Sequence, residues 1–137
     1  MGKKTWQEKL AGGKEPFVVT VDRKLGGVSI GDKMLVPSPR QVDDYIRTIP
    51  VGVGKTVADM RSELGKQNGA DTTCPLCSGI FIRISAEAAQ EELAAGKPAS
   101  EVTPFWRVIP PKAPVRTKVS FPVWIIDDLR RAEGLPV

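Results

Sequence analysis

The chain has 137 residues, of which 41% are hydrophobic and 26% are charged, a composition typical of one soluble globular domain with a buried core. Histidine is absent, which excludes a catalytic triad or a metal site that depends on imidazole. No apolar stretch approaches the roughly 20 residues of a membrane span, and the first residues lead into polar sequence rather than a signal peptide. We therefore expect a cytoplasmic protein without a membrane partner.

Basic residues outnumber acidic residues by 20 to 16, which gives a net charge of +4. The excess is concentrated late in the chain, because residues 102–126 contain no acid and four cations, namely Arg107, Lys112, Arg116 and Lys118. This distribution suits an anionic partner and places any basic face in the C-terminal part of the chain.

The first 37 residues predict little regular structure. Residues 1–16 are rich in lysine and hold Trp6 in a polar setting, which indicates a short helix or a loosely held arm outside the core. Residues 17–21 favour a strand, and residues 28–36, with Gly31 and Asp32 in the middle, favour a small hairpin. We predict an N-terminal arm and short hairpin over residues 1–37, followed by a second domain over residues 38–137.

Three helices are predicted between residues 38 and 96. The first begins at Ser38, whose hydroxyl suits an N-cap, and its inward face carries Val42, Tyr45, Ile46 and Ile49. The second begins at Thr56 and is expected to end at Gly65. The third begins near Pro75 and ends at Gly96, and a four-residue repeat runs along it through Leu76, Ile80, Ile84 and Ala88. The polar turn between the second and third helices gives the outline of a helix-turn-helix.

The remaining residues predict one strand, one loop and one helix. Residues 103–109 are expected to form a strand, and residues 110–114 a stiff loop because they include three prolines. A final helix begins after Pro122, with Ile126 turned inward and Arg130 and Arg131 turned outward. The predicted fold class is mainly α with a small β component.

A Cys-x-x-Cys motif, Cys74 to Cys77, lies at the start of the third predicted helix. The helix dipole lowers the pKa of a thiol at this position, which would favour nucleophilic or redox chemistry. A zinc site needs about four ligands, and the chain has neither a third cysteine nor a histidine. We therefore expect no metal and no cofactor, and the two thiols are either reactive or simply structural.

Two large aromatic residues, Phe105 and Trp106, stand beside Arg107 in the predicted strand. Aromatic faces stack on bases and arginine neutralises phosphate, so this group would suit a nucleic acid. Strand aromatics more commonly belong to the core, and composition alone favours that interpretation.

Four features in this order resemble the DNA-binding domain of the methylated-DNA protein-cysteine methyltransferase family. They are an Ile-Pro-Val-Gly turn at 49–52, the short and long helices of the helix-turn-helix, the run Pro-Phe-Trp-Arg-Val-Ile at 104–109, and the terminal run Leu-Arg-Arg-Ala-Glu-Gly at 129–134. The resemblance covers about residues 38–134. It implies a winged-helix-like domain with a helix-turn-helix that binds double-stranded DNA.

Departures from the family pattern remove the family's chemistry. Phe105 stands where the alkyl-accepting cysteine would be and Trp106 where the histidine would be, so neither a nucleophile nor a base remains there. We predict no catalytic residue and a protein that is not an enzyme. The resemblance implies a former base pocket, open or plugged, formed by Val57, Phe105, Trp106 and Glu133, in which the acid has lost its family partners and serves a structural role.

The resemblance also implies a function like that of the alkyltransferase-like proteins, which keep the binding of damaged or alkylated DNA without catalysis. The residues expected to contact DNA are Thr72, Thr73, Ser78, Arg83, Arg107, Lys112, Arg116 and Lys118. Because these cations are few, binding is expected to be weak and salt-dependent. Two alternatives remain open: an enzyme that uses Cys74 and Cys77, and a protein interaction module on the same fold.

Overall fold

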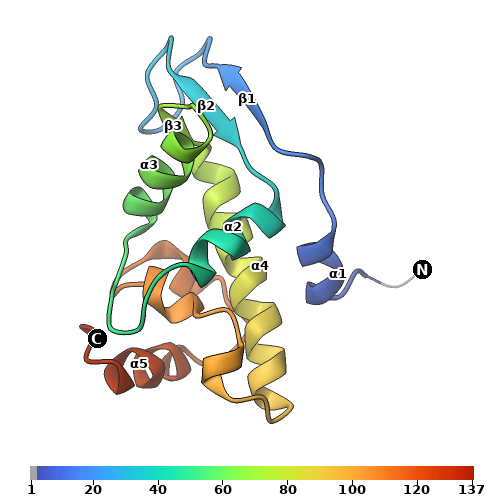
Figure 1. Ribbon diagram of the computed structural model, residues 1–137, viewed down its shortest axis with the longest axis vertical. Coiled ribbons are helices and arrows are strands. Elements are labelled where there is room, and N and C mark those ends of the chain that lie inside the picture. Colours follow the sequence, from blue (N-terminus) through green and yellow to red (C-terminus); the bar gives the residue numbers. More distant parts are fainter. Residues whose placement is uncertain (1–2) are drawn as a thin grey trace.

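The computed structural model describes residues 3–137, which are mainly helical and include one three-stranded sheet (Figure 1). The α-helices are α1 (Trp6–Ala11), α2 (Pro39–Arg47), α3 (Val57–Gln67), α4 (Pro75–Ala94) and α5 (Val123–Ala132). The strands are β1 (Phe17–Thr20), β2 (Lys33–Val36) and β3 (Thr72–Thr73), and the 3₁₀ helices are η1 (Ala99–Glu101), η2 (Phe105–Val108) and η3 (Pro114–Thr117). Within residues 3–137, no helix has the length and apolar character that a membrane crossing needs.

The sheet links the N-terminal part of the chain to the segment between α3 and α4. β1 pairs with β2 in antiparallel register, with Phe17 opposite Val36, and β2 pairs with β3 in parallel register, with Leu35 opposite Thr73. The order is therefore β1-β2-β3, and the turn between α3 and α4 supplies the third strand. This pairing fixes the start of α4 against the sheet.

The predicted helix starts are confirmed. The Ser38 hydroxyl accepts a hydrogen bond from the Gln41 amide at 3.1 Å, which caps α2. Thr56 and Asp59 form a reciprocal capping box at α3, with bonds of 3.0 and 2.9 Å. The inward face predicted for α2 is buried, since Val42, Tyr45, Ile46 and Ile49 are all core residues.

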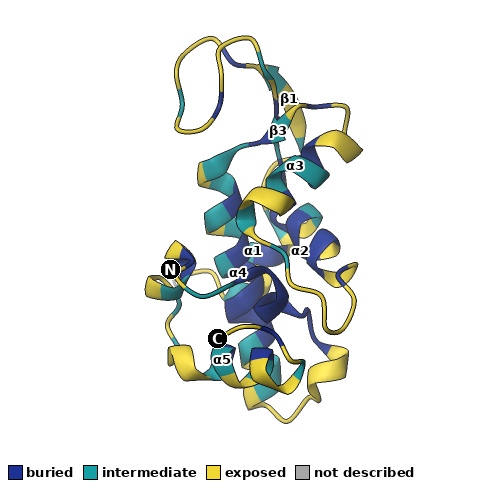
Figure 2. Ribbon diagram, turned by 90° about the vertical axis from the view of Figure 1, so that its left-hand side faces the viewer, coloured by how far each residue is buried: buried dark blue, intermediate teal, exposed yellow. Residues whose placement is uncertain are grey.

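The main core lies where α2, α3, α4, η2 and α5 meet (Figure 2). Its largest fully buried side chains are Trp106 and Phe105, and Met60, Ile82 and Ile126 pack in the same cluster. A smaller cluster joins Leu10 of α1 to α4, and the connection between β1 and β2 is largely exposed. α4 therefore packs on one side into the main core and on another against α1.

The predicted end of the second helix is wrong. α3 continues through Gly65 to Gln67, and Gly65 is buried against the backbone of Thr72. A Cβ at Gly65 would lie 2.7 Å from the Thr72 carbonyl carbon. Glycine is needed here because α3 and β3 approach closely, not because the helix ends.

The hairpin predicted at residues 28–36 is also wrong. Its second half forms β2, but the partner of β2 is β1, and the residues between them form a long connection. The Val21 amide donates to the Asp32 carbonyl at 2.8 Å, and the Gly31 amide donates to the Val21 carbonyl at 2.8 Å. Val21, Val28 and Met34 are buried in one cluster, which holds this connection folded back on the sheet.

The strand predicted at residues 103–109 is instead the 3₁₀ helix η2 with its flanks. Residues 102–109 are all buried, so the segment has no solvent face. A strand with one buried face would place Phe105 and Trp106 on opposite sides, whereas both pack into the core here. The backbone forms local bonds, including one from the Arg107 amide to the Pro104 carbonyl at 3.0 Å.

The final helix follows the prediction except at Arg130, which was expected to face outward. Its side chain is only 2% exposed, and Nη1 donates to the Trp106 carbonyl at 2.6 Å. Nε donates to the Pro136 carbonyl at 2.8 Å. Arg130 is buried because it satisfies carbonyl groups of η2 and of the C-terminal segment, a demand that helical periodicity does not reveal.

Candidate functional site

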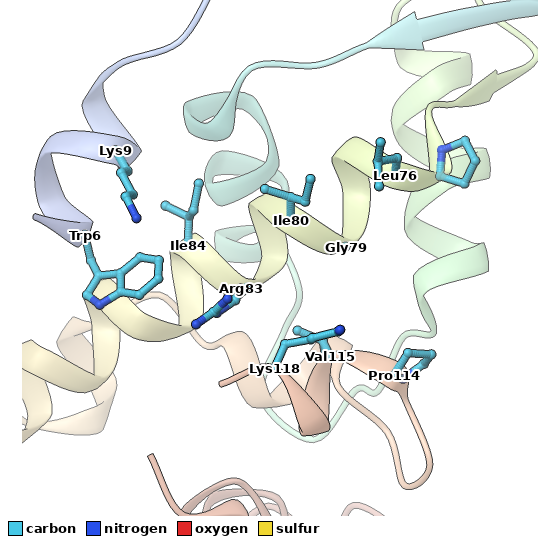
Figure 3. Close-up of a pocket in the computed structure, with 11 residues that line it drawn as sticks. Trp6, Lys9, Leu76, Gly79, Ile80, Arg83, Ile84, Pro114, Val115 and Lys118 are labelled. Carbon is cyan, nitrogen blue, oxygen red and sulfur yellow. The ribbon is translucent and has the colours of Figure 1, made fainter. Parts of the chain in front are cut away.

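A groove of about 670 Å³ lies over the amino-terminal half of α4, between α1 and η3 (Figure 3). We call it the α4 groove, and its lining residues are Trp6, Lys9, Pro75, Leu76, Gly79, Ile80, Arg83, Ile84, Pro114, Val115 and Lys118. The lining is mostly apolar, and Leu76 and Ile80 are 72% and 48% exposed. An open apolar floor on a helix next to a core marks a binding surface.

The four-residue repeat of α4 explains the groove. Ile84 and Ala88 of that repeat are buried against Leu10 of α1, whereas Leu76 and Ile80 extend past the end of α1 and stay exposed. The opposite side of the first two turns packs into the protein through Ser78 and Ile82. The repeat is therefore half core and half surface.

Three cations border the α4 groove, and none of its lining residues is acidic. Lys9 Nζ lies 4.2 Å from the centroid of the Trp6 ring, and Arg83 Cζ lies 5.1 Å from the same centroid. Figure 3 shows Trp6, Lys9 and Arg83 together at one end of the α4 groove, and Lys118 beside Val115. The Arg83 Nε contact to Glu87 is long, 3.5 Å, because that carboxylate accepts closer bonds from Ser120.

The residues predicted to contact DNA do not form one surface. Arg83 and Lys118 line the α4 groove. Thr73 and Ser78 are fully buried, since the Thr73 hydroxyl donates to the Arg61 carbonyl and the Ser78 hydroxyl donates to the Cys74 carbonyl. Thr72 is half-buried in β3. The hydroxyl groups of Thr73 and Ser78 are thus used in internal hydrogen bonds.

The other predicted cations differ in their availability. Lys112 is exposed, with a left-handed backbone at φ 69°. Arg116 is half-buried and pairs with Asp127 at 2.9 Å while its Nε donates to the Pro110 carbonyl. Arg107 is 9% exposed and faces inward. Of the four cations in residues 102–126, Lys112 and Lys118 are therefore exposed at the surface, whereas Arg107 and Arg116 form internal contacts.

The predicted base pocket is filled by its own aromatic residues. Phe105 and Trp106 are 0% and 2% exposed and meet edge to face, with ring centroids 5.2 Å apart. Phe121 packs edge to face against Phe105, with ring centroids 5.8 Å apart, and Val57 packs partly buried against the same core. Both rings are therefore enclosed in the core, and a base could reach them only if the core opened.

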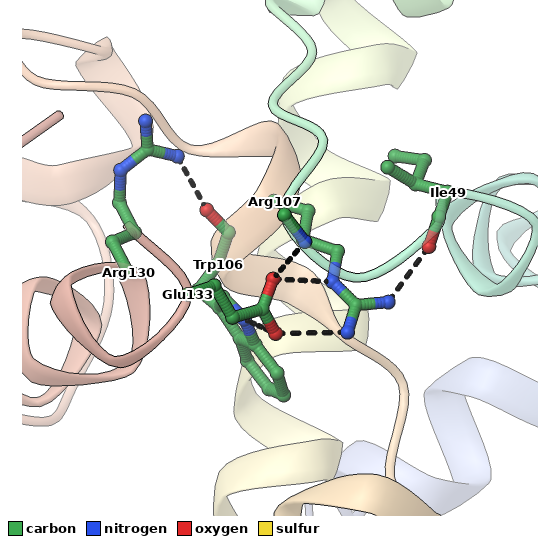
Figure 4. Close-up of polar contacts among 6 residues, drawn as sticks. Ile49, Trp106, Arg107, Arg130 and Glu133 are labelled. Atoms are coloured by element: carbon green, nitrogen blue, oxygen red, sulfur yellow. Dashed lines mark hydrogen bonds and ion pairs between the residues drawn. The ribbon is translucent and has the colours of Figure 1, made fainter. Parts of the chain in front are cut away.

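Glu133 is the centre of a polar network beside these rings (Figure 4). Its Oε1 accepts from the Gly52 amide at 3.0 Å and from Arg107 Nε at 2.9 Å. Its Oε2 accepts from Trp106 Nε1 at 2.9 Å and from Arg107 Nη2 at 2.8 Å. Arg107 Nη1 donates to the Ile49 carbonyl at 2.7 Å. The network ties the turn before α3, η2 and the end of α5 into one unit.

The charge state of Glu133 follows from this network. Burial acts to raise its pKa, but the hydrogen bonds from Arg107, the Gly52 amide and Trp106, with the charge of Arg107, outweigh burial and lower the pKa to about 2. Glu133 is therefore ionised at neutral pH, and all four lone-pair positions of its carboxylate are used. The side chains that donate hydrogen bonds to Glu133 are Trp106 and Arg107, and the sequence did not indicate this pairing.

The two cysteines are free and half-buried at the start of α4. The Cys74 sulfur accepts a hydrogen bond from the Cys77 amide at 3.5 Å and so serves as the N-cap. Burial, together with the neighbouring Cys74, raises the pKa of the Cys77 thiol to about 11. At this position the helix dipole does not make Cys77 a thiolate near neutral pH.

Sequence reasoning missed Trp6, Lys9, Leu76 and Ile80 as parts of a surface. The polar setting of Trp6 was a usable signal, because a tryptophan among lysines is suited to cation–π contacts. No group of three or more histidine, cysteine or acidic residues that could hold a metal ion occurs within residues 3–137. Comparison with known proteins finds no matching family model, no matching curated protein and no matching solved structure.

Proposed function

We propose that this chain is a non-catalytic protein that binds double-stranded DNA through the amino-terminal half of α4. In this proposal α3 and α4 act as the helix-turn-helix of a winged-helix-like domain of the alkyltransferase type. The observation that carries it is the exposed face of the amino-terminal half of α4, which is bordered by Lys9 of α1, Arg83 of α4 itself and Lys118 just after η3, with no acidic residue among the lining residues.

Electrostatics supports a duplex as the partner. Lys9, Arg83 and Lys118 border the α4 groove, and the exposed Lys112 lies in the loop before η3. Together with the positive end of the α4 dipole, these cations would neutralise phosphates along one stretch of backbone. The acids at the other end of α4 include the exposed Glu91, so only the first half of the helix is a favourable contact.

The residues that could have recognised a flipped base are not available to DNA. Phe105 and Trp106 are packed in the core, and Arg107 is held by Glu133. Contact is therefore with the sugar–phosphate backbone, and intact and alkylated duplexes should bind with similar affinity. A clear preference for the alkylated duplex would show that the core opens and would contradict this part of the proposal.

The test is a titration of a fluorescein-labelled duplex by fluorescence anisotropy, with tryptophan emission and gel mobility as further readouts. The double variant Arg83→Gln, Lys118→Gln should bind at least tenfold more weakly than the unchanged chain at low salt. The double variant Lys97→Gln, Arg131→Gln removes the same charge from exposed sites at the end of α4 and on α5, and it should bind nearly as well.

Two outcomes would overturn the proposal. One is the absence of any change in anisotropy, emission or mobility at low salt, for intact and alkylated duplexes alike. The other is an equal loss of affinity in both double variants, which would show that net charge alone attracts the DNA and that α4 has no special part.

A further inference from the structure

The α4 groove has one apolar end and one cationic end, and a DNA backbone, which is charged along its whole length, would not match this difference. One end, at Pro75, Leu76 and Pro114, is apolar, while the other end holds Trp6 between Lys9 and Arg83 (Figure 3). Pro75 and Arg83, which lie in α4 at the two ends, are about 12 Å apart along the helix, given its rise of about 1.5 Å per residue.

We propose that the α4 groove binds a single-chain amphiphilic anion, with the carboxylate at the end of the groove that Lys9 and Arg83 border and the apolar chain along Ile80 toward Leu76. The volume of about 670 Å³ lies within the range of small-molecule sites, roughly 300–1,000 Å³. This inference does not depend on the proposed DNA binding, because it rests on the apolar floor and on the order of charged and apolar residues along it.

The cationic end supplies the recognition. Lys9 and Arg83 both approach the half-buried Trp6 ring, which places two positive charges at this end of the groove. Within residues 3–137, neither Lys9 nor Lys118 forms an ion pair, and the single ion pair of Arg83 is long, at 3.5 Å. An anionic head group at this end would accept charge-assisted hydrogen bonds from these side chains.

The apolar floor supplies the affinity. Leu76 and Ile80 are exposed, and Gly79 between them leaves the helix surface open, with no atom within 4 Å of a Cβ placed there. An alkyl chain laid along this surface would cover both side chains, with Val115 on the opposite wall. Ile84 is already covered by α1, which sets the end of the channel and places the head group beside Trp6.

The test uses decanoate and decyltrimethylammonium, two soluble amphiphiles with the same chain and opposite head charge, in calorimetric titrations of the full chain. We expect saturable one-to-one binding of decanoate, and binding of decyltrimethylammonium at least tenfold weaker. The double variant Lys9→Gln, Arg83→Gln removes both cations of the head-group end and should reduce the difference between the two amphiphiles to less than threefold. The control Lys97→Gln, Arg131→Gln should bind decanoate as the unchanged chain does.

A second variant tests the floor without risk to the fold. Gly79→Leu fills the open surface of α4 and favours the helix, so the thermal midpoint should not fall. Decanoate affinity should fall at least tenfold in this variant. Unchanged affinity in Gly79→Leu, equal affinity for both amphiphiles, or no saturable heat with decanoate would each overturn the inference.

Other occupants give distinct results. If a synthetic amphipathic helix of leucine and glutamate binds in a Gly79-dependent manner and decanoate does not, the groove takes a protein segment and the inference is wrong. If sedimentation shows a dimer that Gly79→Leu abolishes and decanoate does not bind, the occupant is a second copy. A chain that binds decanoate but no duplex contradicts only the proposed function, and the reverse result contradicts only this inference.

Discussion

Glu133 shows how one carboxylate joins three segments that are distant in the sequence. It accepts four hydrogen bonds, two at each oxygen, from the Gly52 amide, the Trp106 indole and Arg107. Its side chain is 12% exposed and that of Arg107 is 11% exposed. A charge this far from water is stable only with a complete set of partners, so the loss of either residue leaves the other unpaired.

We predict that Glu133→Gln lowers the free energy of unfolding by about 2–4 kcal/mol at pH 7. A glutamine amide replaces one oxygen with a donor, and either orientation directs that donor at two existing donors. Urea denaturation followed by circular dichroism measures the effect. The exposed Glu101→Gln serves as the control and should change stability by less than about 0.5 kcal/mol.

The same residue gives a pH dependence with a defined sign. Because the folded pKa of Glu133 is lowered to about 2 from 4.5, its contribution is complete above pH 4.5 and is lost as the pH falls toward 2. The stability difference between the unchanged chain and Glu133→Gln should therefore shrink across that range. A difference that stays constant from pH 7 to pH 3 would mean that the carboxylate is not held as described.

We predict that the Cys77 thiol is unreactive near neutral pH. Its pKa of about 11 leaves only about one thiolate in ten thousand at pH 7, so iodoacetamide should label it slowly. Cys74→Ser keeps an N-cap oxygen and isolates Cys77 for the measurement. The labelling rate should rise with pH to beyond pH 10. A rate that reaches its plateau near neutral pH would favour the alternative enzyme based on the two thiols.

Alanine substitutions at two helical glycines should have opposite effects on the stability of the protein. Gly65→Ala in α3 should destabilise the protein by about 1–3 kcal/mol, because its Cβ would lie within 2.8 Å of three Thr72 backbone atoms. Gly79→Ala in α4 should stabilise it by about 0.5–1 kcal/mol, because the site is open and alanine favours a helix. Thermal unfolding of both variants checks the pair, and unchanged or increased stability in Gly65→Ala would show that α3 and β3 are not in close contact.

The helices were predictable at their starts because the signals there are local. Ser38 and Thr56 accept hydrogen bonds from amides three residues away, so neighbouring residues suffice to place them. Residues 103–109 were predicted wrongly because they are rich in residues that favour strands, while their burial on every side makes η2 the better solution. The repeat of α4 identified a helix correctly but not which half of its stripe α1 covers.

The affinity of the whole protein for DNA should depend strongly on salt concentration. If Lys9, Arg83, Lys112 and Lys118 each neutralise one phosphate, the slope of log K against log salt is about −3.6, and affinity falls roughly 150-fold between 50 and 200 mM salt. In the variant Arg83→Gln, Lys118→Gln the slope should be about −1.8. Anisotropy titrations at several salt concentrations measure both, and equal slopes would exclude these two side chains from the contact.

Composition and neighbours within one helical turn were enough to predict the mainly helical class, the starts of α2, α3 and α4, and the absence of imidazole chemistry. Composition also favoured a core position for Phe105 and Trp106 but left a nucleic-acid role open. Only the folded structure showed that Arg130 faces inward, that Arg107 and Trp106 donate to Glu133, and that Leu76 and Ile80 remain exposed. Burial depends on which distant segment covers a side chain, and no local pattern encodes that neighbour.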